Sequence, residues 1–241
     1  MKLLNALPFP LQVAISKNRL LAVMTGSRYW GLNNLDQKLI AVIGDRPGYF
    51  VELGANDGIS QSNTKHLEMF HGWRGVLVEP YPGNFIKLSK TRAESSHMEN
   101  AACVSFAFDK DEMELIYSNL MTTPMDGSSD VENRKLHAES GEKWLRRKDA
   151  VQTFSVRART LNAILGEAMA PQVIDLLSLD VEGGEIEVLK GIDHSQYRFK
   201  WILVEARDEK RIVEFLEGKR YRFHSKLSEN DYLFSGIPIL D

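Results

Sequence analysis

One short stretch near the start of the chain constrains the fold more than any other. An apolar run at 49–51 leads into an acid, Glu52, and then into a turn of small residues at 54–58. A strand that ends in a glycine-rich turn before a helix lets a nucleotide-like ligand lie against the backbone. Twenty-one residues after this turn, a second run, 74–78, also ends in an acid, Glu79. An acid there can accept both hydroxyls of a ribose, so the pair predicts a cofactor that contains adenosine.

The glycine spacing and the charge of the turn indicate which adenosine cofactor it is. A dinucleotide site needs the pattern G-x-G-x-x-G, whereas this turn places Gly54, Asn56 and Gly58 at every second position. A carboxylate at Glu52 would repel a pyrophosphate but would suit the ammonium and sulfonium groups of S-adenosylmethionine (SAM). The pattern therefore favours SAM over NAD. In the alternative interpretation, Glu52 and Glu79 only terminate their strands.

Composition limits the class of protein. The 241 residues are 43% hydrophobic and 26% charged, which fits one globular domain with a substantial core. The net charge of -3 gives the whole molecule no electrostatic footprint for nucleic acid. A single cysteine, Cys103, excludes an internal disulfide and any site with several cysteine ligands. Cys103 lies in an apolar run, where burial is expected, and a cytoplasmic location fits this sparse cysteine usage.

The N-terminal segment leans apolar but is interrupted by Pro8 and Pro10. It is too short and too broken to span a bilayer, and it shows no small-residue cleavage site of a signal peptide. We expect residues 1–30 to form a leader that packs on the domain, on a partner or loosely on a membrane surface. No transmembrane segment is expected, and the oligomeric state stays open.

Strands and helices alternate along the rest of the chain, which predicts an α/β fold with a doubly wound sheet. Helices are expected at 33–45, 63–70, 84–90, 160–169, 185–190 and 210–216. Strands are expected at 49–51, 75–78, 100–104, 153–156, 174–179, 201–204, 221–225 and 232–235. The last two strands are close enough in sequence to pair as an antiparallel hairpin at one edge. An extra hairpin is expected within 105–117, around three charged residues at 109–111.

The middle of the chain carries a polar insertion at 118–150. So long an irregular segment inside a compact domain is typical of a lid or substrate loop, with disorder as the alternative. The remainder, 31–241, reads as one domain without internal repeats.

With these motifs identified, the chain resembles the FkbM family of SAM-dependent methyltransferases over about residues 30–236. The likeness is carried by four stretches: Val51 to Gly58, Val78 to Pro80, Asn100 to Ala102, and the acidic run from Leu179 to Glu185 with its sequel Val188 to Gly191. The resemblance implies the seven-stranded class I (Rossmann-like) methyltransferase fold. It also implies methyl transfer, usually to an oxygen of a sugar, a glycan or another natural product.

The resemblance also implies a set of cofactor-binding residues at the carboxyl ends of the strands. The methionine part of SAM would lie among Glu52, Gly54, Asn56 and Gly58, and Asp57 in the same turn is a further cofactor-binding residue. Glu79 beside Pro80 would hold the ribose, and Asn100 with Ala101 would lie near the adenine.

Methyl transfer to a hydroxyl needs a group that removes the hydroxyl proton. Asp180 and Glu182, after the expected strand 174–179, are the first candidates for a catalytic base. Asp180 has an equally weighted alternative role as an acceptor for the cofactor ammonium. In a competing mechanism, Asp180, Glu182 and Glu205 would hold Mg²⁺ through their oxygens.

Other side chains have weaker claims to a role. His137 and His224 could act as bases, although a lone histidine is more often a surface or packing residue. Tyr81 and Trp144 could stack on a sugar ring, whereas Trp73 is expected in the core. Three functions stay open: a sugar or glycan O-methyltransferase, a methyltransferase of a non-sugar secondary metabolite, and a non-catalytic module that binds partners.

Overall fold

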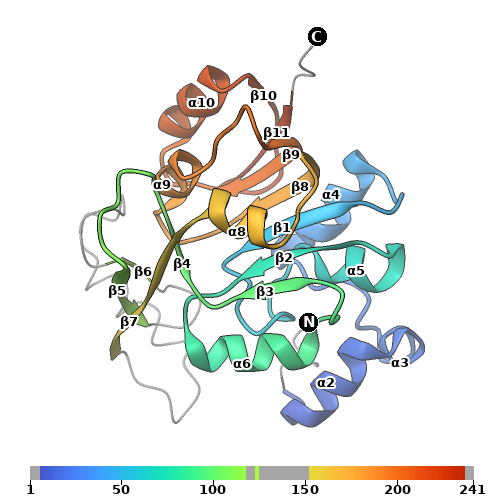
Figure 1. The fold of residues 1–241 in the computed structure, drawn as a ribbon. Coiled ribbons are helices and arrows are strands. Elements are labelled where there is room, and N and C mark those ends of the chain that lie inside the picture. Colours follow the sequence, from blue (N-terminus) through green and yellow to red (C-terminus); the bar gives the residue numbers. More distant parts are fainter. Residues whose placement is uncertain (1–5, 118–122, 125–151, 237–241) are drawn as a thin grey trace.

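A seven-stranded sheet forms the centre of the molecule (Figure 1). The computed structural model describes residues 6–117, 123–124 and 152–236. The strands follow the order β10-β11-β9-β8-β1-β2-β3, and β11 runs antiparallel to both of its neighbours. Their bounds are β1 Tyr49–Leu53, β2 Arg74–Val78, β3 His97–Glu99, β8 Val173–Leu179, β9 Arg198–Glu205, β10 Tyr221–Lys226 and β11 Asp231–Gly236. The predicted doubly wound sheet with an antiparallel edge hairpin is confirmed.

Helices cover both faces of this sheet (Figure 1). One layer consists of α4 (Leu35–Ile43), α5 (Lys65–His71) and α6 (Pro82–Thr91). The other consists of α8 (Leu161–Glu167), α9 (Glu185–Lys190) and α10 (Glu209–Gly218). Each layer has its own apolar core, so the sheet is buried on both faces, as parallel sheets require.

Strand β1 shows how the sequence distributes side chains between these two cores. Val51 and Leu53 belong to the core under α8, α9 and α10, whereas Phe50 belongs to the core under α4, α5 and α6. Because side chains alternate along a strand, Glu52 lies on the same face as Phe50. A carboxylate buried in this layer needs hydrogen-bond donors or a cation as partners.

A second sheet stands beside the first and corrects two predictions. It has the order β4-β7-β5-β6, with bounds β4 Ala102–Val104, β5 Glu112–Tyr117, β6 Thr123–Pro124 and β7 Gln152–Thr160. A strand forms within the predicted range 100–104, as β4, but it belongs to this second sheet, and the place expected for it in the main sheet is taken by the three-residue β3. The hairpin expected within 105–117 is also wrong, because β5 pairs with the distant β7. Cys103 in β4 is half-buried rather than fully buried.

The starts of α4 and α5 differ in how they are capped. Asn34 precedes α4 in a left-handed conformation and makes no capping hydrogen bond with its side chain. The hydroxyl of Ser62 accepts a hydrogen bond from the backbone N–H of Lys65 at 3.0 Å, at the start of α5. The bounds of α9 agree with the predicted 185–190.

The N-terminal segment forms two short helices, α2 (Phe9–Lys17) and α3 (Arg19–Met24). Their inner side chains Ile15 and Ala22 pack with Trp30 and Ile59 in a separate small core. Within the described part of the chain, no helix combines the length and the apolar character that crossing a bilayer requires. The predicted lid at 118–150 lies outside the described residues, apart from 123–124.

Candidate functional site

The candidate site lies at the topological switch point of the main sheet, at the end of β1. Strand β1 pairs with β2 on one side and with β8 on the other, so the chain adds strands outward in both directions from this point. Ligands of open α/β sheets bind beyond the carboxyl ends of the strands at such a switch point. Gly54 follows the end of β1, Asp180 follows the end of β8, and the two residues lie next to each other. The backbone N–H of Asp180 donates to the carbonyl of Leu53 at 3.3 Å.

Gly54 cannot be replaced by a residue with a side chain without moving this junction. Its φ of +77° is in the left-handed region, and an added Cβ would lie 1.9 Å from the carbonyl oxygen of Asp180. The turn is then bonded to the end of β2. The N–H groups of Gly54 and Ala55 both donate to the carbonyl of Val78 at 3.1 Å. The sequence pattern at 54–58 therefore fixes three strand ends against one another.

Glu79 is the buried acid at the end of β2, as the sequence predicts. Its Oε2 accepts from the N–H of Asn56 at 2.8 Å, and its Oε1 accepts from the N–H of Tyr81 at 2.9 Å. Burial raises the pKa of Glu79 to about 7, although these two backbone bonds act in the opposite direction. A carboxylate offers about four acceptor positions, so two oxygens with one backbone bond each keep capacity for a ribose diol.

The other residues expected near the ribose and adenine gather around Glu79. The side-chain amide of Asn100 donates to the carbonyls of Glu79 at 2.8 Å and of Pro80 at 2.9 Å. Ala101 follows Asn100 and is fully buried. Asn100 thus fixes the chain that leaves β2. The contacts of these residues with a cofactor stay a prediction.

Asp57 and Gly58 shape the loop from within. The Asp57 carboxylate accepts from the N–H of Ile59 at 3.1 Å, and from the N–H and hydroxyl of Ser60 at 2.7 and 3.0 Å. Gly58 has a φ of +78°, and an added Cβ would lie 2.4 Å from the hydroxyl oxygen of Thr91. The Asp57 carboxylate thus bonds the loop to itself, and Gly58 packs the loop against α6. The predicted contact of both residues with the cofactor stays untested.

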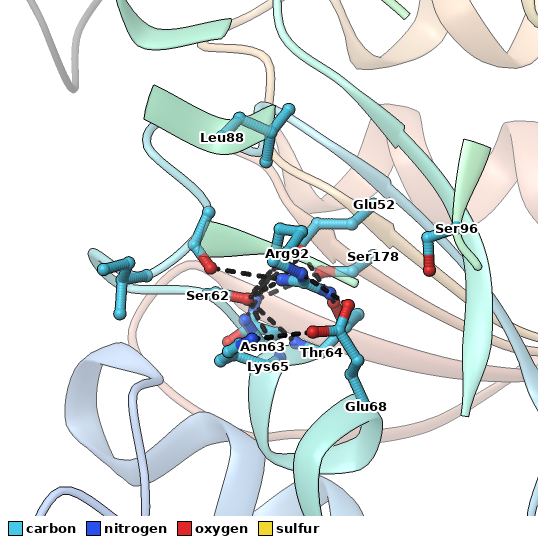
Figure 2. A network of polar contacts seen from close by, with 12 residues as sticks. Glu52, Ser62, Asn63, Thr64, Lys65, Glu68, Leu88, Arg92, Ser96 and Ser178 are labelled. Carbon is cyan, nitrogen blue, oxygen red and sulfur yellow. Dashed lines mark hydrogen bonds and ion pairs between the residues drawn. The ribbon is translucent and has the colours of Figure 1, made fainter. Parts of the chain in front are cut away.

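Glu52 is enclosed by protein donors (Figure 2). Its carboxylate accepts from the Ser62 hydroxyl at 3.0 Å, the Asn63 N–H at 2.9 Å and the Thr64 hydroxyl at 2.6 Å. Arg92 adds an ion pair at 3.2 Å. A direct bond from Glu52 to the cofactor ammonium stays a prediction, and it would have to replace some of these bonds. In the structure as it stands, Glu52 binds the loop that leads from the cofactor turn to α5.

Arg92, which was not among the predicted site residues, extends this network to α5. Its Nε lies 2.9 Å from Glu68, whose other oxygen lies 2.6 Å from the Lys65 ammonium. Arg92 is fully buried and Lys65 is 2% exposed. Burial alone would raise the pKa of Glu68, but Arg92 and Lys65 outweigh it and lower that pKa. The run of hydroxyl and amide residues at 62–64 is the one sequence signal that could have indicated a buried charge nearby.

Asp180 and Glu205 form a hydrogen-bonded carboxyl pair at the ends of the adjacent strands β8 and β9. Burial raises the pKa of Asp180 well above its ordinary range, and the nearby Glu205, Glu182 and Glu185 raise it further. Burial and Glu182 also raise the pKa of Glu205. Two neighbouring carboxyl groups of this kind titrate as a unit.

Glu182 and Glu185 have different parts in the same loop. Glu182 has a left-handed φ of 55° and forms an ion pair with Arg207 at 2.6 Å. The Glu185 carboxylate accepts from the N–H groups of Val181 at 3.2 Å and Gly183 at 3.0 Å, which fixes the loop before α9. The predicted convergence of Asp180, Glu182 and Glu205 on Mg²⁺ does not fit this arrangement. Among the described residues, no group of three or more His, Cys, Asp or Glu side chains is placed to hold a metal ion.

The aromatic candidates divide between the core and the neighbourhood of the site. Tyr81 stacks on Tyr117 with ring centroids 3.5 Å apart, and Phe154 meets Tyr81 edge-on, so the three rings join the second sheet to the end of β2. Trp73 is buried in the core, as expected. His224 lies on the edge strand β10 against Trp201. His137 and Trp144 lie outside the described residues.

Comparison with solved structures finds methyltransferases with very low sequence identity. A structure of the METTL16 MTase domain is 11% identical with a TM-score of 0.44, and the alignment covers 85% of this chain and 66% of that one. The precorrin-6y C5,15-methyltransferase from Geobacter metallireducens GS-15 is 12% identical with a TM-score of 0.42, over 84% of this chain and 85% of that one. The N-terminal domain of human METTL16 in complex with SAH is 12% identical with a TM-score of 0.44, over 93% and 81%. The chain thus spans just under two thirds of the first of these structures. Similarity at this level says nothing of the substrate.

Comparison with curated proteins and with family models gives one match. No curated protein matches the chain. The model of the methyltransferase FkbM domain matches residues 52–223, which is more than half of the sequence and includes Glu52, Glu79, Asp180 and Glu205. The chain therefore belongs to the FkbM methyltransferase domain family.

Proposed function

We propose that this protein is a SAM-dependent O-methyltransferase that transfers a methyl group to a hydroxyl of a sugar or glycan. The observation that carries the proposal is the junction of the 54–58 turn with the buried Glu79 at the switch point of the sheet. Family membership supports methyl transfer by this chain. The choice of a hydroxyl on a sugar rests on the resemblance to the family.

The residues at this junction fit the parts of SAM. Glu79 keeps acceptor capacity for both ribose hydroxyls, and Asn100 with Ala101 borders the place of the adenine. Gly54 presents an exposed backbone next to Asp180, where the methionine part would lie. When bound, SAM supplies an activated methyl group on its sulfonium.

The chain itself supplies a group that can take the acceptor proton. An alcohol does not ionise near neutral pH, so a base must receive its proton during or after attack. The ionised form of the Asp180–Glu205 pair is suited to this, because its raised pKa makes it a stronger base than an ordinary carboxylate. Glu182, the second catalytic candidate, would act beside Arg207 at the rim of the same loop.

Two other functions differ in the acceptor or in the chemistry. A non-sugar secondary metabolite would use the same cofactor junction and the same base, so only an acceptor screen separates it from a glycan. A non-catalytic module would have no need for the half-buried Asp180–Glu205 pair, which disfavours it. A cytoplasmic location is proposed with the enzyme, on the basis of the single cysteine.

The substitution Asp180→Asn tests the base directly. We expect a fall in methyl transfer from labelled SAM by roughly 10²- to 10⁴-fold, the usual contribution of a general base, with little change in affinity for S-adenosylhomocysteine (SAH). The wild-type rate should rise with pH as the pair ionises. The exposed substitution Glu214→Gln serves as the control.

The alternative role of Asp180 predicts a different result. If Asp180 binds the cofactor ammonium, Asp180→Asn weakens SAH binding to a degree that accounts for the lost rate. Unchanged transfer by a variant that still binds SAH would contradict both roles.

A further inference from the structure

The outer face of the N-terminal helix α3 carries apolar side chains in an unusual place. Leu20, Val23 and Met24 are 69%, 52% and 75% exposed. Their spacing of three and four residues places them together on one side of the helix. Leu11 on the neighbouring α2 is exposed as well. The three exposed side chains of α3 are named the outer apolar face.

This face does not hold the helices on the domain. The contacts that do so come from Ile15 and Ala22, which are buried against Trp30 and Ile59. The helix pair lies at the periphery of the molecule, with α2 packed on α6 (Figure 1). The outer apolar face is therefore surplus to folding, and clustered exposed apolar side chains of this kind mark interaction surfaces.

The charged residues of the N-terminal segment are all positive. Residues 1–35 contain Lys2, Lys17, Arg19 and Arg28 but no Asp or Glu, in a chain whose net charge is -3. Lys17, Arg19 and Arg28 are exposed. The guanidinium groups of Arg19 and Arg28 lie over the Phe70 ring at 5.2 and 5.8 Å, which keeps both cations beside α3.

From this arrangement we infer that α2 and α3 dock on the surface of an anionic phospholipid bilayer. The exposed leucine, valine and methionine side chains would enter the boundary between headgroups and acyl chains, and the cations would pair with lipid phosphates. Apolar burial and electrostatic attraction are each weak alone, and stable peripheral binding needs two such signals. The acidic remainder of the molecule would orient this segment toward the membrane.

Vesicle flotation of the full chain tests the inference. The protein should float with vesicles of phosphatidylcholine and phosphatidylglycerol at low salt, and high salt should release it. The triple variant Leu20→Ser, Val23→Ser, Met24→Ser should bind at least about tenfold more weakly, given the apolar area withdrawn from the interface. Lys17→Glu should weaken binding by at least about fivefold, the share expected for one cation near such a surface.

Two controls accompany the flotation experiment: variants of exposed apolar side chains elsewhere on the surface, and a measurement of the oligomeric state. Ile86→Ser and Met169→Ser, at positions 56% and 89% exposed, should bind like the wild type. All variants should keep the wild-type thermal unfolding, because none of these side chains packs in a core. Absence of wild-type binding, equal binding to pure phosphatidylcholine, or equal loss in the controls would overturn the inference. Light scattering that shows a dimer, converted to a monomer by the triple variant, would assign the face to a second copy instead.

Discussion

The Glu79 carboxylate has a structural role at the end of β2 and a proposed role in binding the ribose. Two backbone N–H groups hold it at the end of β2, and burial raises its pKa to about 7. Near neutral pH the free protein is thus divided between a protonated and an ionised Glu79. Only the ionised form can accept hydrogen bonds from both ribose hydroxyls with its full set of lone pairs.

This titration predicts a pH-dependent affinity for the cofactor product. The affinity for SAH should fall as the pH is lowered below about 7, approaching about tenfold per pH unit, because the carboxyl must lose a proton before it binds the ribose. Isothermal titration between pH 6 and pH 8.5, roughly the range in which a group of this pKa changes charge, would measure it. Glu79→Gln should bind more weakly at high pH and show a flat profile. A wild-type profile as flat as that of Glu79→Gln would remove Glu79 from the ribose site.

At the scale of elements, a buried charge network holds the end of the loop between β1 and α5, in addition to the apolar packing of Ile59. Glu52 lies on the strand face that looks toward α5 and α6, and Arg92 at the end of α6 binds it from across the layer (Figure 2). Arg92 also binds Glu68 in α5, so one side chain joins three elements. Breaking a buried ion pair leaves an uncompensated charge in the interior.

Arg92→Leu should therefore destabilise the protein by about 3–5 kcal/mol, since Glu52 and Glu68 would stay buried without their partner. Urea unfolding followed by circular dichroism measures the difference. Arg92→Lys should recover only part of the loss, because an ammonium cannot reproduce the fork of bonds to two carboxylates. The exposed Arg211→Leu should change the free energy of unfolding by no more than about 0.5 kcal/mol. A similar cost for Arg92→Leu and Arg211→Leu would show that the network adds nothing to stability.

The sequence predicted those elements that local pattern specifies. The turn at 54–58, the strand-end acids Glu79 and Asp180 and the helix α9 follow from residue spacing and periodicity over a few residues. Strand β3 escaped prediction because it has three residues and a polar sequence. The second sheet escaped because β5 pairs with β7, from which it is separated by the long insertion.

Contacts between distant residues of the site could not be predicted from the sequence either. Glu52 was predicted as a cofactor ligand from its position before the turn. In the structure it lies on the same strand face as Phe50, in the layer of α4, α5 and α6. The Asp180–Glu205 pair depends on β8 and β9 lying side by side, which a topology rule suggests but no local motif encodes. Pairings of this kind arise from tertiary structure, and a single sequence carries little information on them.

At the scale of the whole molecule, the two halves of the main sheet supply different parts of the proposed reaction. The half that contains β2 and β3 provides the residues expected at the ribose and the adenine, from Glu79 to Ala101. The half that contains β8 and β9 provides the proposed base. The Tyr81–Tyr117 stack joins the second sheet to the half with β2 and β3. Tyr117 directly precedes the insertion at 118–150 in the sequence. We propose that this insertion selects the acceptor within a single domain over 31–241.

The central claim is that the junction of β1, β2 and β8 binds SAM, and a titration of the full chain with SAH tests it most directly. We predict saturable binding of one SAH per chain, no binding of NAD, and a gain in stability of about 2.7 kcal/mol when SAH is present at a hundred times its dissociation constant. Thermal unfolding with and without SAH supplies the second readout. A folded protein that binds no SAH, or that binds NAD in its place, would contradict the account.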